Sequence, residues 1–151
     1  MQTVVQPLTT KDYDAVQDIF YEAFKGPEYA DKNCEESWRD RSVPDSLGIF
    51  SLEGVLLGFA IVSFQKRNGP NRYLDYLAVH SAFRGQDLGS KLLKHILKVC
   101  RDLRQSIHLY PVDNNRIRAW YRSHGFYDTA QGYMNQHFYE TRSTCKNVAP
   151  L

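Results

Sequence analysis

The sequence has little of what marks a secreted, membrane-spanning or nucleic-acid-binding protein. Its three cysteines, Cys34, Cys100 and Cys145, are odd in number and far apart, which argues against a disulfide framework and against a paired metal-ligand motif. The amino terminus lacks a charged stretch followed by an apolar run, and no apolar stretch approaches the ~20 residues that cross a bilayer. The formal net charge is only +2, whereas nucleic-acid binding favours clustered basic residues. We therefore expect a cytoplasmic protein that binds neither a membrane nor nucleic acid.

Metal-binding patterns are also missing. The five histidines, His80, His95, His108, His124 and His137, show no ligand spacing. We therefore expect no metal ion and assign the histidines to surface or packing positions.

The composition is that of one ordinary globular domain. Of the 151 residues, 42% are hydrophobic and 24% are charged, which suits a single core of common domain size. The chain contains no linker, internal repeat or low-complexity segment. We assign residues 1–142 to one domain and expect 143–151, which lack a periodic pattern, to form a loose tail.

Hydrophobic periodicity predicts alternating strands and helices. Apolar residues recur at helical spacing from Tyr13 to Phe24, after Thr9 and Asp12, which have the spacing of a capping box. Runs rich in β-branched, aromatic and leucine residues predict strands. The expected strands cover 4–8, 47–52, 55–66, 72–79, 106–112, 126–129 and 134–140, and the expected helices cover 13–24, 31–41, 88–103 and 114–124. The order β-α-α-β-β-β-α-β-α-β-β predicts an α/β fold with a mixed sheet and helices on both faces.

The turn before the 88–103 helix has features of an anion-binding site. It reads Arg84-Gly85-Gln86-Asp87-Leu88-Gly89-Ser90. Glycine allows close backbone approach, and the free amides and the dipole at a helix start favour negative charge. The turn lacks the three spaced glycines of dinucleotide-binding proteins and the Gly-Lys-Ser/Thr of a P-loop. An ordinary helix start with a solvent-facing Arg84 explains the same residues equally well.

A second motif, N-x6-Y-x3-G-F, lies on the last predicted helix and its exit. Its residues are Asn114, Tyr121, Gly125 and Phe126. Together with the preceding turn, this motif resembles the GCN5-related N-acetyltransferase (GNAT) superfamily over residues 47–139. The order of the helices before that range agrees with the family. The resemblance implies a single-domain GNAT-like fold, with acetyl-CoA as the co-substrate.

The resemblance also implies a role for each part of these motifs. The strand Leu77-Ala78-Val79 would carry the pantetheine arm, and the amide of Leu77 or Val79 would stabilise the oxyanion. Asn114 would contact pantetheine or carbonyl groups, and a helix N-cap is an equally good role for it. Many relatives are dimers, so a homodimer is implied by analogy alone. The diphosphate would be bound by the turn residues Arg84, Gly85, Gln86, Asp87, Leu88, Gly89 and Ser90.

Asp87 departs from the family pattern, because it stands where relatives usually have the first glycine of the turn. A carboxylate near a diphosphate is repelled unless it points to solvent or caps the helix. We expect Asp87 to turn outward while its amide still donates, with weaker cofactor binding as the consequence.

Asp75 is our hypothesis for a catalytic base. A primary amine with a pKa near 10.4 needs about 4.6 kcal/mol to lose its proton at pH 7, so a base, or a water oriented by a base, assists the reaction. Strand alternation places this residue on one face with Tyr73, Leu77 and Val79. Asp75 also resembles the corresponding residue of spermidine/spermine acetyltransferases, which is acidic. The alternative is a structural carboxylate paired with Arg72.

Tyr121 is the candidate hydrogen-bond donor to the leaving thiolate. Full proton transfer from a phenol with a pKa near 10 to a thiolate with a pKa near 8.5 is uphill by about 2 kcal/mol. We therefore expect a strong hydrogen bond, with the proton delivered late or by solvent. A core aromatic beside Trp120 is the alternative interpretation.

The segment from Glu22 to Asp45 is acidic. It contains seven acidic and four basic residues, a net charge of −3, against +5 for the rest of the chain. A cationic acceptor would be steered toward it, and we assign substrate binding to Glu22, Glu28 and Asp75. A solvated helix face explains the same charges.

Short runs are also similar to spermidine/spermine acetyltransferases. They are Phe83-Arg84-Gly85, Gly89-Ser90-Lys91-Leu92-Leu93-Lys94 and Gln136-His137-Phe138-Tyr139. The resemblance implies an N-acetyltransferase that acts on a small cationic amine such as a polyamine. A protein lysine or N-terminus is an alternative acceptor. A CoA-binding sensor or interaction module without catalysis is an alternative class.

Overall fold

The computed structural model describes residues 1–24, 27–64, 71–111 and 114–138, with the side chains of 27–31 left out. The expected tail lies outside these ranges. Within them the elements follow the predicted order, which confirms the α/β fold. The strands are β1 (Thr3–Pro7), β2 (Leu47–Ser51), β3 (Leu56–Ser63), β4 (Arg72–Val79), β5 (Ile107–Leu109), β6 (Tyr127–Asp128) and β7 (Met134–Gln136). The helices are α1 (Tyr13–Ala23), α2 (Pro27–Asp40), α3 (Leu88–Leu103) and α4 (Asn115–Ser123), with 3-10 turns η1 (Thr10–Asp12) and η3 (Ser81–Phe83).

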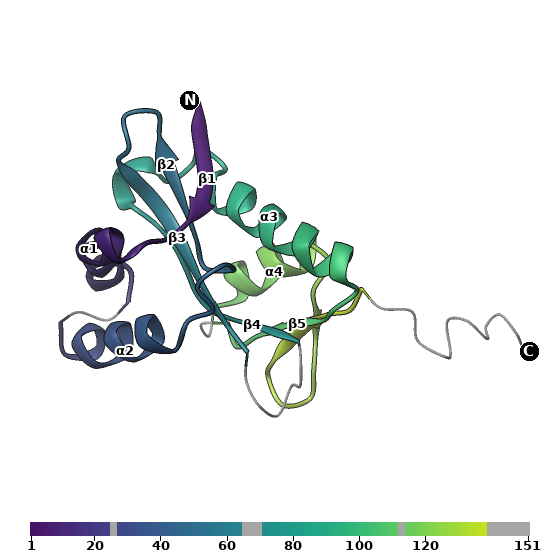
Figure 1. Ribbon diagram of the computed structural model, residues 1–151. Helices are drawn as coiled ribbons and strands as arrows, with labels where there is room; N and C mark the ends of the chain where they lie inside the picture. Colours follow the sequence, from purple (N-terminus) through teal and green to yellow (C-terminus); the bar gives the residue numbers. More distant parts are fainter. Residues whose placement is uncertain (25–26, 65–70, 112–113, 139–151) are drawn as a thin grey trace, which may run out of the picture.

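Helices cover both faces of the sheet, with α1 and α2 on one side and α3 and α4 on the other (Figure 1). On the first side, Val16, Ile19 and Phe20 of α1 pack with Phe59 of β3. Every residue of β3 is buried, as expected of a central strand. On the second side, the buried face of α3 consists of Leu88, Leu92, Leu93, Ile96, Leu97 and Cys100.

Among the described helices, none is both long and apolar enough to cross a membrane.

The sheet opens between two of its strands. The strand order is β1-β2-β3-β4-β5-β7-β6, and only the β4–β5 pair is parallel. That pair joins Arg72 to Ile107, and its last partners are Leu74 and Leu109. Since β4 continues to Val79 while β5 ends at Leu109, the two strands diverge toward the carboxyl end of β4.

A β-bulge in β4 changes which side chains share a face. Ile61 pairs with Tyr76, but the next residue of β3, Val62, pairs with Leu74, so Asp75 is left without a partner in the ladder. The extra residue interrupts the alternation of the strand. Leu74 and Leu77 therefore contact the same core cluster. The prediction that Tyr73, Asp75, Leu77 and Val79 share one face is wrong for this reason.

Other expected elements differ from the structure at their ends. The second helix begins at Pro27, earlier than the expected residue 31, because proline is well suited to the first turn of a helix. Strand β5 is shorter than the expected 106–112, because its parallel partner diverges after Leu109. Of the expected strand at 134–140, the structure contains Met134–Gln136, and 139–140 lie outside the described residues.

Candidate active site

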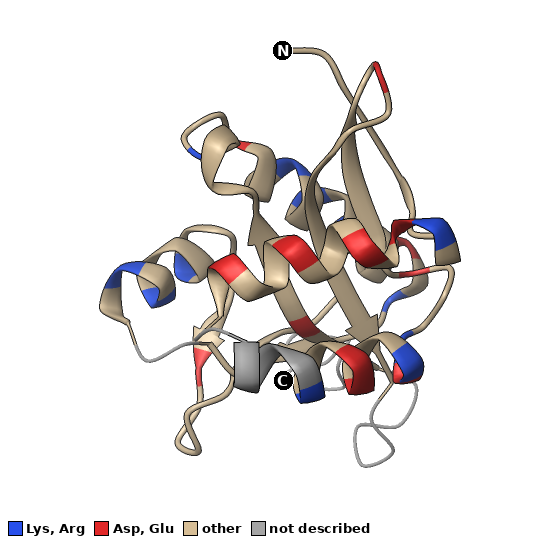
Figure 2. Ribbon diagram, turned by 90° about the vertical axis from the view of Figure 1, so that its left-hand side faces the viewer, with Lys and Arg blue, Asp and Glu red and all other residues tan. Residues whose placement is uncertain are grey.

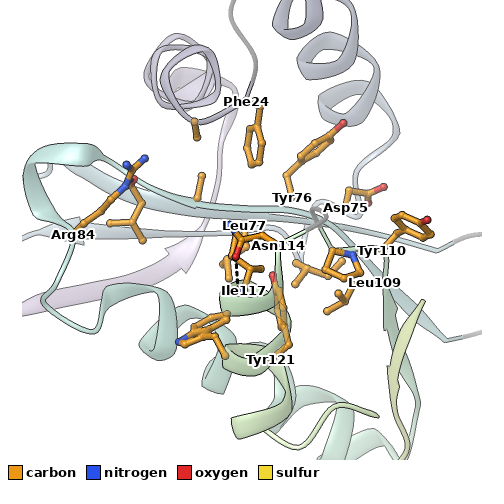
Figure 3. A pocket seen from close by; sticks show the side chains of 16 residues that line it. Phe24, Asp75, Tyr76, Leu77, Arg84, Leu109, Tyr110, Asn114, Ile117 and Tyr121 are labelled. Carbon is orange, nitrogen blue, oxygen red and sulfur yellow. Dashed lines mark hydrogen bonds between the residues drawn. The ribbon is translucent and has the colours of Figure 1, made fainter. Parts of the chain in front are cut away.

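The divergence of β4 from β5 opens a cleft of about 700 Å³. One wall is β4 from Leu74 to Val79, and the other wall is the end of β5 together with α4. Figure 3 shows that side chains reach the cleft from both faces of the sheet, with Phe24 on the α1 side and Tyr121 on the α4 side. A molecule in the cleft can therefore contact both layers of helices.

The edge of β4 that faces the cleft can bind an extended chain. Beyond Leu74 this edge has no neighbouring strand among the described residues. Backbone N–H and C=O groups need partners, and an extended ligand with amide groups can pair with them as an added strand does. The predicted pantetheine-binding residues Leu77, Ala78 and Val79 all line this part of the cleft.

Free amides lie at the start of α3. The first helical hydrogen bond runs from Lys91 N to Asp87 O at 3.0 Å, so the preceding amides of the helix have no acceptor within it. Gly85 has φ +85°, a conformation that favours glycine. Arg84 lines the cleft, and its Nε donates to Val79 O at 3.1 Å. Amides, helix dipole and guanidinium together suit a diphosphate.

The remaining residues of the predicted turn have different surroundings. Gln86 and Asp87 are exposed, and the Asp87 side chain makes no capping hydrogen bond although its backbone is left-handed, with φ 61°. Leu88 is buried in the core, so only its backbone is available to a ligand. Gly89 lies against Trp120.

Tyr121 is both a core residue and a cleft residue. Only 8% of it is exposed, and its ring packs against Trp120 and Phe126, with centroid distances of 4.9 and 5.5 Å. Its hydroxyl end points to the cleft, below Leu77 in Figure 3. Burial raises the pKa of Tyr121, because a phenolate is poorly solvated there. The phenol therefore keeps its proton at neutral pH and can donate a hydrogen bond.

Asn114 caps helix α4. Its Oδ1 accepts hydrogen bonds from Arg116 N at 2.8 Å and from Ile117 N at 3.2 Å. The same residue lines the cleft (Figure 3). The N-cap role that the sequence allowed is present in the structure, and it holds the amino end of α4 beside the cleft.

Asp75, at the bulge, lies on the same side of β4 as Tyr76 and lines the cleft (Figure 3). Its Oδ2 is buried and has no hydrogen-bond partner. The pKa of Asp75 is raised to about 6, chiefly by burial; a hydrogen bond with Ser63 lowers it in part, and the negative charge of Asp40 makes a smaller contribution to the rise. A carboxylate with this pKa is ionised at pH 7 and ready to accept a proton.

Arg72, which the sequence offered as a partner for Asp75, pairs elsewhere. Its Nη2 lies 2.9 Å from Asp45 Oδ1, with side chains only 7% and 13% exposed, and Nη1 donates to Gln105. This ion pair ties β4 to the segment before β2. No described cation forms a salt bridge with Asp75.

The acidic segment contributes little directly to the cleft. Glu22 accepts a hydrogen bond from Ser81 N at 2.9 Å, and this bond lowers the pKa of Glu22. Ala23 and Phe24, not Glu22, line the cleft. The side chain of Glu28 lies outside the described residues. The assignment of Glu22 and Glu28 to substrate binding therefore stays a prediction, and Figure 2 shows acidic residues following one another along the outer side of α1.

Sequence reasoning missed the aromatic lining of the cleft. Phe24 and Tyr76 meet on the α1 side with ring centroids 5.1 Å apart, and Tyr110 lines the cleft after β5. The helical spacing of Phe24 indicated only a buried face, and nothing in the strand pattern separated Tyr76 from a core residue. Within the described part of the chain, no group of three or more His, Cys, Asp or Glu side chains could hold a metal ion.

Several solved structures share this fold. The crystal structure of PH1933 from Pyrococcus horikoshii OT3 has a TM-score of 0.74 at 18% identity, covering 93% of this chain and 99% of that one. The ribosomal-protein-S18-alanine N-acetyltransferase of Escherichia coli has a TM-score of 0.73 at 20% identity, covering 93% and 96%. The PaiA N-acetyltransferase of Thermoplasma acidophilum, solved with coenzyme A, has a TM-score of 0.69 at 17% identity, covering 91% and 99%. No curated protein sequence matches the chain.

These structural similarities show the fold alone, and a family model shows the protein family. The model of the acetyltransferase (GNAT) family matches residues 13–126. The match begins with α1 and ends at Phe126, and it therefore includes the cleft, the turn before α3 and Tyr121. Most of the chain lies within this range, and the chain belongs to the GNAT acetyltransferase family.

Proposed function

We propose that the protein transfers the acetyl group of acetyl-CoA to a primary amine by direct attack, and that the acceptor is a small cationic amine such as a polyamine. The observation that carries this proposal is the cleft itself. It places a protonated phenol, Tyr121, and a carboxylate with a pKa of about 6, Asp75, on opposite walls. Arg84, which precedes the first turn of α3, lines the same cleft.

Different backbone groups of the protein can bind different parts of acetyl-CoA. The unpaired edge of β4 offers N–H and C=O groups to the amides of pantetheine. The first amides of α3 and the guanidinium of Arg84 offer donors to the diphosphate. An amide of β4 at Leu77 or Val79 would donate to the carbonyl oxygen of the thioester as negative charge develops on it.

Asp75 provides the means of removing a proton from the amine. An ammonium group must be deprotonated before it attacks, at a cost of about 4.6 kcal/mol at pH 7 for an ordinary amine. The carboxylate of Asp75, which lines the cleft, can accept this proton directly or through a water molecule. The neutral amine nitrogen then forms its bond to the thioester carbon, and the carbon–sulfur bond breaks with its electron pair leaving on sulfur. The second proton lost by the nitrogen passes through solvent to the thiolate, which gives the amide and free CoA thiol.

Tyr121 stabilises the departing sulfur. Its hydroxyl points into the cleft, and burial keeps it protonated. A hydrogen bond to the thiolate lowers the barrier to cleavage without requiring complete transfer of the phenolic proton.

The charge and lining of the acceptor side support a cationic amine. Exposed acids follow α1, and Figure 2 shows them on the side of the molecule from which Phe24 reaches the cleft. The rings of Phe24, Tyr76 and Tyr110 attract a cation through their faces. A protein N-terminus is the second candidate acceptor, because one structural neighbour is named as a ribosomal-protein-S18-alanine N-acetyltransferase.

The test is release of CoA thiol from acetyl-CoA with millimolar spermidine, other small amines and peptides with free N-termini or lysines. We expect amine-dependent release, highest with polyamines. Turnover of peptides alone would exclude the small-amine acceptor, and release at the buffer background with every amine would exclude the transferase. Binding of acetyl-CoA without turnover would indicate a sensor.

Tyr121→Phe tests the proposed geometry at the sulfur. We expect kcat to fall by roughly an order of magnitude or more, since the phenolic donor is lost while the ring is kept. The affinity for acetyl-CoA should barely change, because the diphosphate and pantetheine contacts lie elsewhere. Unchanged turnover at a saturating amine concentration would remove Tyr121 from the mechanism.

A further inference from the structure

The end of α4 is joined to the first turn of α3 by a side-chain hydrogen bond. Nε2 of His124, the residue that ends α4, lies 3.2 Å from Ser90 Oγ. The other ring nitrogen, Nδ1, lies 2.9 Å from the carbonyl oxygen of Trp120. The hydroxyl of Ser123 donates to the same carbonyl and lies farther from Nδ1, at 3.3 Å. Because a carbonyl only accepts, Nδ1 carries hydrogen, and Nε2 of the neutral ring accepts from Ser90.

Ser90 is the third residue of α3, and its amide belongs to the free donors of the predicted diphosphate site. A serine hydroxyl in a helix commonly turns back to a carbonyl of the preceding turn. The bond to His124 instead holds this hydroxyl toward α4. The bond therefore fixes the orientation of the first turn of α3 relative to the end of α4.

Trp120 supports the same turn. A Cβ atom built on Gly89 would lie 3.6 Å from the indole ring, which is ordinary packing distance. The indole also packs on the imidazole of His124, with centroids 4.6 Å apart. Helix α4 thus contacts Gly89 through Trp120 and Ser90 through His124, and Figure 1 shows α3 and α4 on the same face of the sheet.

We propose that His124 is a positioning residue for the diphosphate of acetyl-CoA and acts through Ser90. The inference rests on the proposed function, since it requires acetyl-CoA to bind at the start of α3. Tyr121 lies three residues before His124, which caps the same helix, and it lines the cleft. The His124–Ser90 bond therefore sets the distance between the amides that hold the diphosphate and the phenol that meets the sulfur.

Two substitutions of His124 distinguish the effect of its bond to Ser90 from the effect of its bond to Trp120 O. His124→Asn places an amide nitrogen near the position of Nδ1, so it keeps a donor for Trp120 O but cannot reach Ser90. His124→Gln places a polar atom near the position of Nε2 and can restore the bond to Ser90. Calorimetric titration of the full chain with CoA should show about three- to tenfold weaker binding for His124→Asn, the range of one hydrogen bond. His124→Gln should stay within about twofold of the unmodified protein.

A thioester without a diphosphate distinguishes positioning from a general structural role. Turnover of acetyl-pantetheine should be the same for His124→Asn and the unmodified protein, whereas a general loss of structure would lower turnover of both thioesters. Ser90→Ala should weaken CoA binding in the unmodified background and add little to His124→Asn, because both changes remove one bond.

The outcomes are separable. Failure of the unmodified protein to bind CoA would overturn the proposed function and this inference together. Equal CoA affinities of the unmodified protein and His124→Asn would overturn the inference alone. Equal losses with acetyl-pantetheine and acetyl-CoA would also overturn it.

Discussion

At the level of single residues, the Asp75 carboxyl has a pKa of about 6 because β4 buries it. A carboxyl whose pKa is raised on folding favours the folded state below its unfolded pKa, and this contribution is lost as the pH rises through about 6. At pH 7 the ionised group therefore destabilises the protein, by up to about 3 kcal/mol for a shift of this size. The same ionised form is the one that can accept a proton from an amine.

Asp75→Asn should separate these two effects. We expect the free energy of unfolding at pH 7 to rise and the rate with a saturating amine to fall by roughly a hundredfold, the usual loss for a general base. The acid limb of the kcat/KM profile near pH 6 should disappear. Asp40→Asn is the matched control, since removal of its charge should move that limb to lower pH without abolishing activity. Full activity of Asp75→Asn would exclude the base.

Asp87 is the residue that departs from the family pattern. It is exposed and adopts a left-handed backbone, which asparagine also tolerates. Asp87→Asn should therefore tighten CoA binding by about 1 kcal/mol, roughly fivefold, through loss of one charge near the diphosphate. The gain should shrink in high salt, because the group is exposed. Asp102→Asn, at the far end of α3, should leave CoA affinity unchanged, and an equal effect there would assign the gain to net charge.

At the level of elements, the turn before α3 depends on one glycine. Gly85 has φ +85°, and a Cβ atom there would meet nothing within 4 Å. Gly85→Ala should therefore cost about 1–2 kcal/mol of stability through backbone strain alone and should also raise the KM for acetyl-CoA. Gly54→Ala is a matched control, because Gly54 has φ +89° and equally open space in the β2–β3 hairpin. Equal KM values in the two variants would show that the conformation of the turn does not matter to the cofactor.

Long periodic elements were predictable, because their patterns are local. The boundaries of α3 and β4 agree with the expectation, and Asn114 and Tyr121 of the last motif line the cleft. The orientation of Asp75 could not be obtained in this way. The bulge depends on how β4 pairs with β3, and simple alternation assumes an uninterrupted ladder.

The contacts around the site were less predictable than the sequence motifs, because they join residues that are far apart in the chain. The contact between His124 and Ser90 joins residues 34 positions apart, and no local pattern indicates it. The acidic count of 22–45 indicated none of the contacts of these acids and left out the exposed Asp14 and Asp18 of α1. Glu22 meets the backbone of Ser81 because α1 ends beside the turn that follows β4.

At the level of the whole molecule, charge is divided between the two layers of helices. Helices α1 and α2 contain eight acidic and two basic residues, whereas α3 and α4 contain one acidic and seven basic residues, and the exposed acids of α1 lie on the acceptor side (Figure 2). A polycation approaching this side is attracted before it meets the cleft, whereas an acceptor with one charge is attracted less. Such attraction between exposed groups acts over a Debye length of about 10 Å at 0.1 M salt.

The variant Asp14→Asn with Asp18→Asn removes two of these exposed charges outside the cleft. We expect its KM for spermidine to rise about two- to fivefold at low ionic strength, with kcat unchanged, because only encounter and weak binding are affected. The difference from the unmodified protein should vanish near 0.3 M salt, where screening is within about 6 Å. Glu53→Gln, in the β2–β3 hairpin, should leave the KM unchanged. A KM of the unmodified protein that does not respond to salt would mean that the acids of α1 are ordinary solvated charges, and the choice of acceptor would then rest on Asp75 and the aromatic lining alone.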